Sequence, residues 1–294
     1  MYLLIGCGYI GERVADLLLE NGETVNAVTH SSESADKLSA VKQFPVLNAD
    51  VGDMDSLRAL QAKLPAMPEA VLHCASSNRG GAAQYQHVFV QGCKNLVEMF
   101  PTSHLLFTSS SSVYPQTDGS SVDETSPAEP DSLTSALLRE AEKIVLNHAG
   151  GGAVARLAGL YGPHRSFVLK QFLQGTAAIE GNHGQGRCLN QIHREDASRA
   201  IVHLASGRKS GIFNVVDRHP MTQRECFLHL QTLFDRPLPP ETEPKTERKR
   251  PWTHKCVMGD KLADSGFTWL YPSYFDALKN DRDLLPSILA QVAS

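Results

Sequence analysis

The sequence predicts an α/β protein with a Rossmann-type, doubly wound parallel sheet and a smaller C-terminal substrate-binding lobe. Two observations carry this prediction. Short apolar runs alternate with longer segments of helical periodicity over about the first two-thirds of the chain, as βαβ units require. A glycine-rich turn directly follows the first apolar run and leads straight into a helical segment, which is typical of a dinucleotide-binding unit.

The elements follow from the same patterns. We predict strands at residues 2–5, 24–29, 44–47, 70–74, 104–109, 152–157 and 212–216. Apolar residues at helical spacing predict helices at residues 11–21, 88–99 and 133–148. We expect residues 1–161 to form an NAD(P)-binding domain and residues 162–294 a smaller substrate lobe, of which 190–217 returns to the sheet. The proline-rich and charged stretch 237–251 is predicted as an exposed loop.

Composition narrows the class of protein. The 294 residues carry a net charge of -4, which gives no reason to expect nucleic acid or an anionic membrane as a partner, and points to a small molecule. No apolar stretch is long enough, at about 18 residues, to predict a membrane span. The six cysteines include no Cys-x-x-Cys pair, which favours reduced thiols and a cytoplasmic protein. His183, Cys188 and His193 lack the fourth ligand of a zinc site, so no metal is expected.

The glycine-rich turn has the GxGxxG spacing, with Gly6, Gly8 and Gly11 enclosing Tyr9 and Ile10. The first glycine permits a tight turn, the second lets the backbone approach a pyrophosphate, and the third allows close packing of helix and strand. The helix that follows presents its N-terminus to the anion. These five residues are therefore predicted to bind the cofactor.

The end of the second strand is expected beside the adenosine ribose. NAD-specific sites usually place a carboxylate there, whereas this chain has Thr29, His30 and Ser31. Hydroxyls and an imidazole can bond a 2′-phosphate, so NADP is favoured. NAD is left open because this segment contains no arginine. Asp50, after the third strand, is predicted to contact the adenine amino group, with a simple turn residue as the alternative.

Ordered segments along the chain resemble the extended short-chain dehydrogenase/reductase family, the NAD-dependent epimerase/dehydratase group that acts largely on nucleotide sugars. The segment at 72–76 is similar to the family's fourth strand, which implies that Ala75 and Ser76 contact the cofactor. Further similar segments lie at 107–114, 156–163, 190–196, 213–217 and 262–274. Within the family, a small bacterial YeeZ-like group looks most similar. The resemblance implies NAD(P), a small-molecule substrate and a homodimer.

The family's catalytic Tyr-x-x-x-Lys pair is missing. When residues 140–143 are matched to the family's Glu-Ala-Glu-Lys tail, the tyrosine position falls on Thr134 and the lysine position on Leu138, and no tyrosine in the chain has a lysine four places later. A threonine hydroxyl is far less acidic than a phenol of pKa about 10, so the usual proton transfer cannot run at this position.

Three residues remain as catalytic candidates. Ser110 matches the family's catalytic serine, Tyr114 is the surrogate acid closest to it in sequence, and Thr134 occupies the tyrosine position. His193 is a weaker alternative as a base, because an imidazole titrates near neutral pH. We expect an epimerase/dehydratase-like oxidoreductase for a small polar substrate, nucleotide sugars among the candidates. The alternative is a non-catalytic NADP(H) sensor or scaffold.

Overall fold

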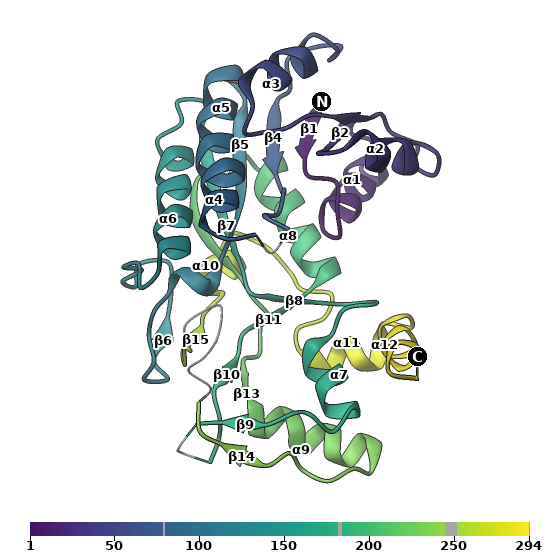
Figure 1. The fold of residues 1–294 in the computed structure, drawn as a ribbon, viewed down its shortest axis with the longest axis vertical. Helices are drawn as coiled ribbons and strands as arrows, with labels where there is room; N and C mark the ends of the chain where they lie inside the picture. Colours follow the sequence, from purple (N-terminus) through teal and green to yellow (C-terminus); the bar gives the residue numbers. More distant parts are fainter. Residues whose placement is uncertain (79, 182–183, 245–251, 294) are drawn as a thin grey trace. The chain divides into compact units, whose positions relative to one another are not determined.

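The computed structural model describes residues 1–78, 80–181, 184–244 and 252–293, and the chain divides into two compact units (Figure 1). The first unit contains Met1–Val113, Ser132–Arg156 and Ser198–Phe213. The second contains Tyr114–Asp131, Leu157–Ala197 and Asn214–Ser294.

A seven-stranded sheet forms the centre of the first unit, in the order β12-β7-β5-β4-β1-β2-β3. β1 pairs in parallel with β2 and β4, and the pairs β2–β3 and β4–β5 are also parallel. Every residue of β1 and β4 is buried, as expected when helices cover both faces of a parallel sheet. The seven predicted strands are confirmed to within two residues; they are β1 (Tyr2–Ile5), β2 (Val25–Thr29), β3 (Val46–Asn48), β4 (Ala70–His73), β5 (His104–Ser110), β7 (Gly152–Leu157) and β12 (Gly211–Val215).

The helices of this part of the chain begin at side-chain caps in several places. Ser31, Asp53 and Ser132 each accept a hydrogen bond from a backbone N–H in the first helical turn that follows. The helices predicted at 11–21 and 133–148 are confirmed to within two residues, and the one predicted at 88–99 is confirmed as an α-helix from Gly92 onward. α5 lies beside α6 (Figure 1). The helices are α1 (Gly11–Glu20), α2 (Ser32–Ser39), α3 (Met54–Gln61), α4 (Ala82–Tyr85), α5 (Gly92–Met99), α6 (Leu133–Leu146) and α8 (Arg194–Ser206), with a 3-10 turn η2 (Ser111–Val113).

One helix differs from its predicted form. α4 continues into a π-helical turn, η1 (Gln86–Gln91), before α5 begins. Within this turn the Val88 carbonyl oxygen lies 3.0 Å from Nε2 of the buried His73 on β4. The imidazole therefore bonds a carbonyl of the widened turn, which periodicity alone does not predict.

The second unit consists of short two-stranded pieces and helices around an apolar core that includes Leu169, Phe172, Cys226, Phe227 and Tyr274. The pairs are β8–β11, β9–β14, β10–β13 and β6–β15. The strands are β6 (Ser121–Val122), β8 (Gly159–Tyr161), β9 (Ile179–Glu180), β10 (Cys188–Leu189), β11 (Gln191–His193), β13 (Met221–Thr222), β14 (Glu241–Thr242) and β15 (Cys256–Val257). The helices are α7 (Phe167–Leu173), α9 (Gln223–Phe234), α10 (Asp260–Asp264), α11 (Tyr274–Asn280) and α12 (Leu284–Ala293).

The prediction of reduced thiols throughout is wrong for two cysteines. Cys188 and Cys256 form a disulfide, with Cα atoms 5.5 Å apart. The Asn190 side chain bonds the backbone on both sides of Cys256, at Lys255 O and Val257 N, and so holds the two segments together. Because 68 positions separate the two cysteines, their spacing does not predict the bond. With this disulfide present, the cysteine pattern no longer supports a cytoplasmic location. The other four cysteines are free.

The predicted exposed loop at 237–251 is also partly wrong. Glu241–Thr242 pairs in parallel with Ile179–Glu180, so this part of the stretch is a strand. Residues 245–251 and His183 lie outside the described residues. In the part of the chain that the structure describes, no helix is long and apolar enough to cross a membrane.

Candidate dinucleotide site

The three glycines of the turn after β1 have different surroundings. Gly6 has φ +95°, and a Cβ on it would lie 2.3 Å from the Ala75 backbone. A Cβ on Gly11 would lie 2.2 Å from the Gly6 carbonyl oxygen. At Gly8 a Cβ would meet nothing within 4 Å among the described residues. The chain's own packing therefore requires Gly6 and Gly11, whereas Gly8 borders open space, as the backbone must if a pyrophosphate is to approach it.

The turn leads into α1 without an interruption of hydrogen bonding. Glu12 N donates to Gly8 O at 2.8 Å and Val14 N donates to Ile10 O at 3.0 Å, while Tyr9 is half-buried and Ile10 is buried. Among the described residues no side chain caps this helix N-terminus. Its first N–H groups and the positive end of the helix dipole are thus suited to an anion.

Strand ends on both sides hold the turn in place. Gly6 N and Cys7 N both donate to the Val28 carbonyl of β2, at 2.9 and 3.0 Å. On the other side Ala75, just after β4, packs against Gly6. Ser76 follows it, is exposed, and accepts a hydrogen bond from Asn78 N. The carboxyl ends of β2, β1 and β4 therefore bring Gly6, Ala75 and Ser76 together at one edge of the sheet.

The predicted ribose residues follow β2 at the same edge. Thr29 is buried and its hydroxyl donates to Ser31 O at 3.0 Å, while Ser31 caps α2. His30 is exposed. The three side chains carry hydroxyls and an imidazole but no carboxylate, so nothing on this segment repels a 2′-phosphate.

Asp50 lies next to this segment, because Ala49 N donates to Thr29 O at 3.0 Å. Its carboxylate accepts a hydrogen bond from Gly52 N at 2.9 Å and lies 2.9 and 3.0 Å from Nε2 of His87. Partial burial by itself raises the pKa of Asp50, but the bonds from His87 and Gly52 outweigh it and hold the pKa below its ordinary value. Sequence reasoning missed His87, which lies 37 positions away and belongs to no motif.

Two of the predicted catalytic residues lie in the first unit. Ser110 is the last residue of β5, is half-buried, and its Oγ accepts a hydrogen bond from Ser112 N at 3.2 Å. Thr134 is the second residue of α6, and its hydroxyl lies 3.3 Å from Ser132 Oγ. Leu138, at the family's lysine position, is buried in the core, so no cation stands at this position of α6.

A buried ionic cluster lies beneath the end of β5. Glu142 of α6 is fully buried and accepts hydrogen bonds from Ser109 Oγ at 2.7 Å and from Arg156 Nε and Nη2 at 3.0 and 2.8 Å. Arg139 also donates to it. The cluster ties α6 to the strand residue that precedes Ser110. Sequence reasoning missed it, because the partners come from three separate elements.

Tyr114 belongs to the second unit and is fully buried. Its hydroxyl donates to Asn214 Oδ1 at 2.8 Å. The ammonium of Lys255 donates to the Tyr114 carbonyl, and burial lowers the pKa of this lysine to about 8. These contacts fit a residue that holds a loop in place better than one that exchanges protons with a substrate.

His193, the weaker candidate base, is also in the second unit. Its Nε2 lies 2.9 Å from Asp281 Oδ2, and its ring lies edge-on to Tyr161 and Tyr271. Burial lowers its pKa below the ordinary value, although Asp281 and Asp196 act in the opposite direction. Within the described residues no three His, Cys, Asp or Glu side chains are grouped to hold a metal ion.

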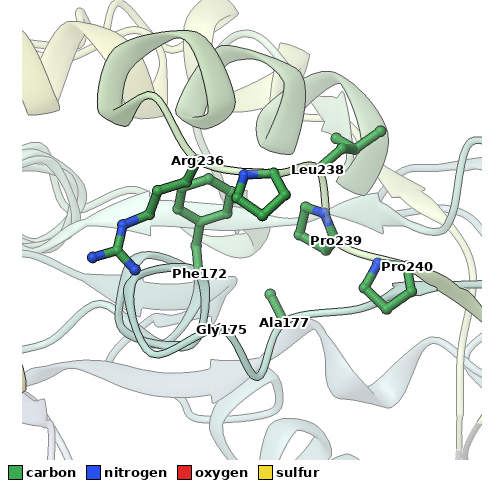
Figure 2. Close-up of a pocket in the computed structure, with 8 residues that line it drawn as sticks. Phe172, Gly175, Ala177, Arg236, Leu238, Pro239 and Pro240 are labelled. Atoms are coloured by element: carbon green, nitrogen blue, oxygen red, sulfur yellow. The ribbon is translucent and has the colours of Figure 1, made fainter.

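A small cavity of about 130 Å³ lies within the second unit (Figure 2). Figure 2 shows the Arg236 side chain at one end of it and Pro239 and Pro240 at the other. Its volume is well below the roughly 300 Å³ at which ligand pockets begin, so it cannot hold a nucleotide sugar as it stands. The cavity is lined by Phe172, Gly175, Ala177, Arg236, Pro237, Leu238, Pro239 and Pro240, none of them a predicted site residue.

Comparison with protein families matches residues 2–215 to the NAD dependent epimerase/dehydratase family. The chain belongs to this family. The match runs from the first strand of the sheet to the last, and it includes every predicted cofactor and catalytic residue. No curated protein matches the chain.

Solved structures of two epimerases and a dehydratase have a similar fold. The Helicobacter pylori ADP-L-glycero-D-manno-heptose-6-epimerase is 19% identical, with a TM-score of 0.77 over 98% of this chain and 96% of its own. The Thermotoga maritima UDP-glucose 4-epimerase with UDP-glucose is 19% identical, with a TM-score of 0.75 over 99% and 100%. A double mutant of DesIV, the dTDP-glucose 4,6-dehydratase of Streptomyces venezuelae, with NAD bound, is 19% identical, with a TM-score of 0.74 over 95% and 94%.

Proposed function

We propose that this protein is an NADP-preferring, epimerase/dehydratase-like oxidoreductase of the atypical, YeeZ-like kind that lacks the Tyr-x-x-x-Lys pair. Its proposed substrate is a small polar molecule of the nucleotide-sugar class. The observation that carries the proposal is the open backbone at Gly8, which lies between an uncapped helix N-terminus and a ribose segment without a carboxylate. We propose that residues 1–161 form the NAD(P)-binding domain, which also supplies Ser110 and Thr134 to the substrate, and that residues 162–294 form the smaller substrate lobe.

The residues at the sheet edge fit a dinucleotide. Gly6, Gly8 and Gly11 shape the turn, and Tyr9 and Ile10 supply the backbone that faces the pyrophosphate. Further along, we propose that His30 bonds a 2′-phosphate and Asp50 the adenine amino group. The hydroxyls of Thr29 and Ser31 would join His30 by turning from Ser31 O and Ser34 Oγ, to which they now donate. Ala75 and Ser76 complete the cradle beside Gly6. A bound nicotinamide would supply or accept a hydride.

The chain's own polar groups must then orient the substrate and handle its proton. Ser110 stands at the end of a rigid central strand, where open α/β sheets bind ligands, and its hydroxyl can hydrogen-bond a substrate oxygen. Thr134 can add a second hydrogen bond but is too weak an acid to replace a phenol. We therefore assign Ser110 the main polar contact, Thr134 a supporting one, and Tyr114 a structural role.

Thermal unfolding with NADP(H), with NAD(H) and without ligand tests the cofactor assignment. A cofactor at 100 times its Kd should stabilise the fold by about 2.7 kcal/mol, which raises Tm by roughly 5 to 10 °C for a chain of this size. A larger shift with NADP(H) supports the proposal. No shift with either cofactor would refute it.

Activity is tested by a screen with nucleotide sugars, followed through the absorbance of the reduced nicotinamide for net oxidation or reduction and through NMR of the sugar where the hydride is returned to it. In the presence of a productive substrate, Ser110→Ala should lose about 10²-fold or more in kcat, as expected when a donor to a reacting oxygen is removed. Ser112→Ala is the control, because Ser112 bonds Ser110 only through its backbone N–H. Equal turnover of Ser110→Ala and the unaltered enzyme would end the role of Ser110.

The second candidate is a non-catalytic NADP(H) sensor or scaffold. It is favoured by one observation, which is that Leu138 is buried where the family's lysine should bond the nicotinamide ribose. The two candidates predict the same cofactor binding and differ in turnover. Cofactor-dependent stabilisation without hydride transfer to any nucleotide sugar would support the sensor.

A further inference from the structure

Three residues outside the glycine turn lie in contact at the adenosine end of the proposed site. Asp50 follows β3, Gly52 lies two residues later, and His87 comes from η1. The imidazole fills the space beside Gly52 so closely that a Cβ there would lie 2.5 Å from the ring. His87 is thus packed against the backbone of the turn as well as hydrogen-bonded to its carboxylate.

The helix that carries His87 is fixed to this turn at a second point. Asn95 of α5 is buried and donates from Nδ2 to the Val51 carbonyl at 2.9 Å, and Gln91 in turn donates to Asn95 at 2.7 Å. The His73 bond to Val88 lies in the same π-helical turn as His87. The position of His87 is therefore set by the surrounding structure, and π-helical turns of this kind occur frequently at functional sites.

The direction of the hydrogen bond follows from the charge state of Asp50. Because its pKa lies below the ordinary value, the carboxylate is ionised at neutral pH and can only accept. Nε2 of His87 must then carry the hydrogen that is shared between the two oxygens. An imidazole in this tautomer points its N–H dipole at the carboxylate and offsets part of its negative potential.

We propose that His87 is a specificity-determining residue of the dinucleotide site, because its pairing with Asp50 allows a 2′-phosphate to bind beside that carboxylate. The inference rests on the proposed NADP preference. It explains why the Asp50 carboxylate, which lies next to the ribose segment, does not exclude a 2′-phosphate by charge repulsion. Asp50 follows the paired residues Thr29 and Asn48, and Ala49 N donates to Thr29 O at 3.0 Å, so Asp50 lies next to the segment proposed to bind the 2′-phosphate. The pair is part-exposed, and a bound adenosine would cover it and strengthen its electrostatic effect.

The test is the ratio of the Kd values for NADP⁺ and NAD⁺, measured by calorimetry. His87→Leu should weaken NADP⁺ binding about tenfold, or about 1.4 kcal/mol, and change NAD⁺ binding less than about twofold. His87→Gln keeps a donor toward Asp50 and should lose less. In an Asp50→Asn background, where no charge remains to be offset, His87→Leu should leave the ratio unchanged.

Lys94→Leu is the matched control, because Lys94 is a half-exposed cation paired with Glu140 on the helix that continues from η1. It should leave the ratio as it is in the unaltered protein. An unchanged ratio in His87→Leu, or an equal change in the Asp50→Asn background, would overturn the role of His87 and leave the proposed function standing. Binding of neither cofactor by the unaltered protein would overturn both.

Discussion

Gly6 and Gly8 stand two residues apart in the same turn, but a methyl group added to each would meet different surroundings. At Gly6, whose backbone has a positive φ, it would overlap the Ala75 backbone, whereas at Gly8 it would enter open space. The demand for glycine at one position thus comes from the fold. At the other, we infer that it comes from the ligand.

Gly6→Ala is expected to destabilise the protein by at least about 1 to 3 kcal/mol, the cost of a strained backbone before any overlap is counted. Gly8→Ala should fold with nearly unaltered stability and weaken cofactor binding about tenfold or more. Chemical denaturation and calorimetric titration of both variants check this. A Gly8→Ala protein that binds the cofactor normally would contradict the assignment of Gly8.

The buried His73 on β4 should make the free energy of unfolding depend on pH. Burial lowers its pKa from 6.5 to about 4. Between these values the unfolded chain binds a proton that the folded chain does not, so stability falls as the pH falls through this window. The loss should approach about 3 kcal/mol near pH 4 and vanish above about pH 6.5. Unfolding free energies across this range, with NMR titration of the imidazole, test it; titration near pH 6.5 in the folded protein would refute it.

At the scale of elements, α6 is held to the sheet by the buried Glu142 rather than by apolar contacts alone. Its carboxylate joins Ser109 at the end of β5 to Arg156 of β7. α6 also carries Thr134 and β5 ends at Ser110, so the cluster joins the two elements that carry these candidate catalytic residues.

Glu142→Gln should destabilise the protein by about 3 to 5 kcal/mol, because it leaves the Arg156 guanidinium buried without its counter-charge. Glu140→Gln makes the same chemical change on the exposed face of the same helix and should stay within about 0.5 kcal/mol of the unaltered protein. Urea denaturation of both variants measures the difference. Equal stabilities would show that the buried pair contributes nothing.

Local patterns in the sequence predict the strands and the glycine turn but not the contacts between distant segments. The strands of the sheet are predictable because each is an apolar run, and Gly6, Gly8 and Gly11 because a turn is local in the chain. The π-helical turn, His87 and the Glu142 cluster are not predictable, because each depends on side chains brought together from distant segments. Some segments that carry the family resemblance also support the fold, since Asp196 accepts bonds from Leu270 N and Tyr271 N.

At the scale of the whole molecule, the Cys188–Cys256 disulfide closes a long loop of the chain. A bond between residues 68 positions apart should stabilise the fold by about 4 kcal/mol, chiefly by restricting the unfolded chain. Reductant is therefore expected to lower the denaturation midpoint of the unaltered protein but not that of Cys188→Ser/Cys256→Ser. Thiol labelling that finds six free cysteines in non-reducing buffer would contradict the pairing.

The sheet itself is completed late in the sequence. β7 gains its outer neighbour only from β12, and residues 158–210 are made between them. On the ribosome, a nascent chain of the first 161 residues already contains the glycine turn, yet β7, all of whose residues are buried in the complete protein, is still an edge strand that invites association with other chains. The half of the molecule that we expect to bind the cofactor must therefore wait, during synthesis, for a segment of the other half to emerge.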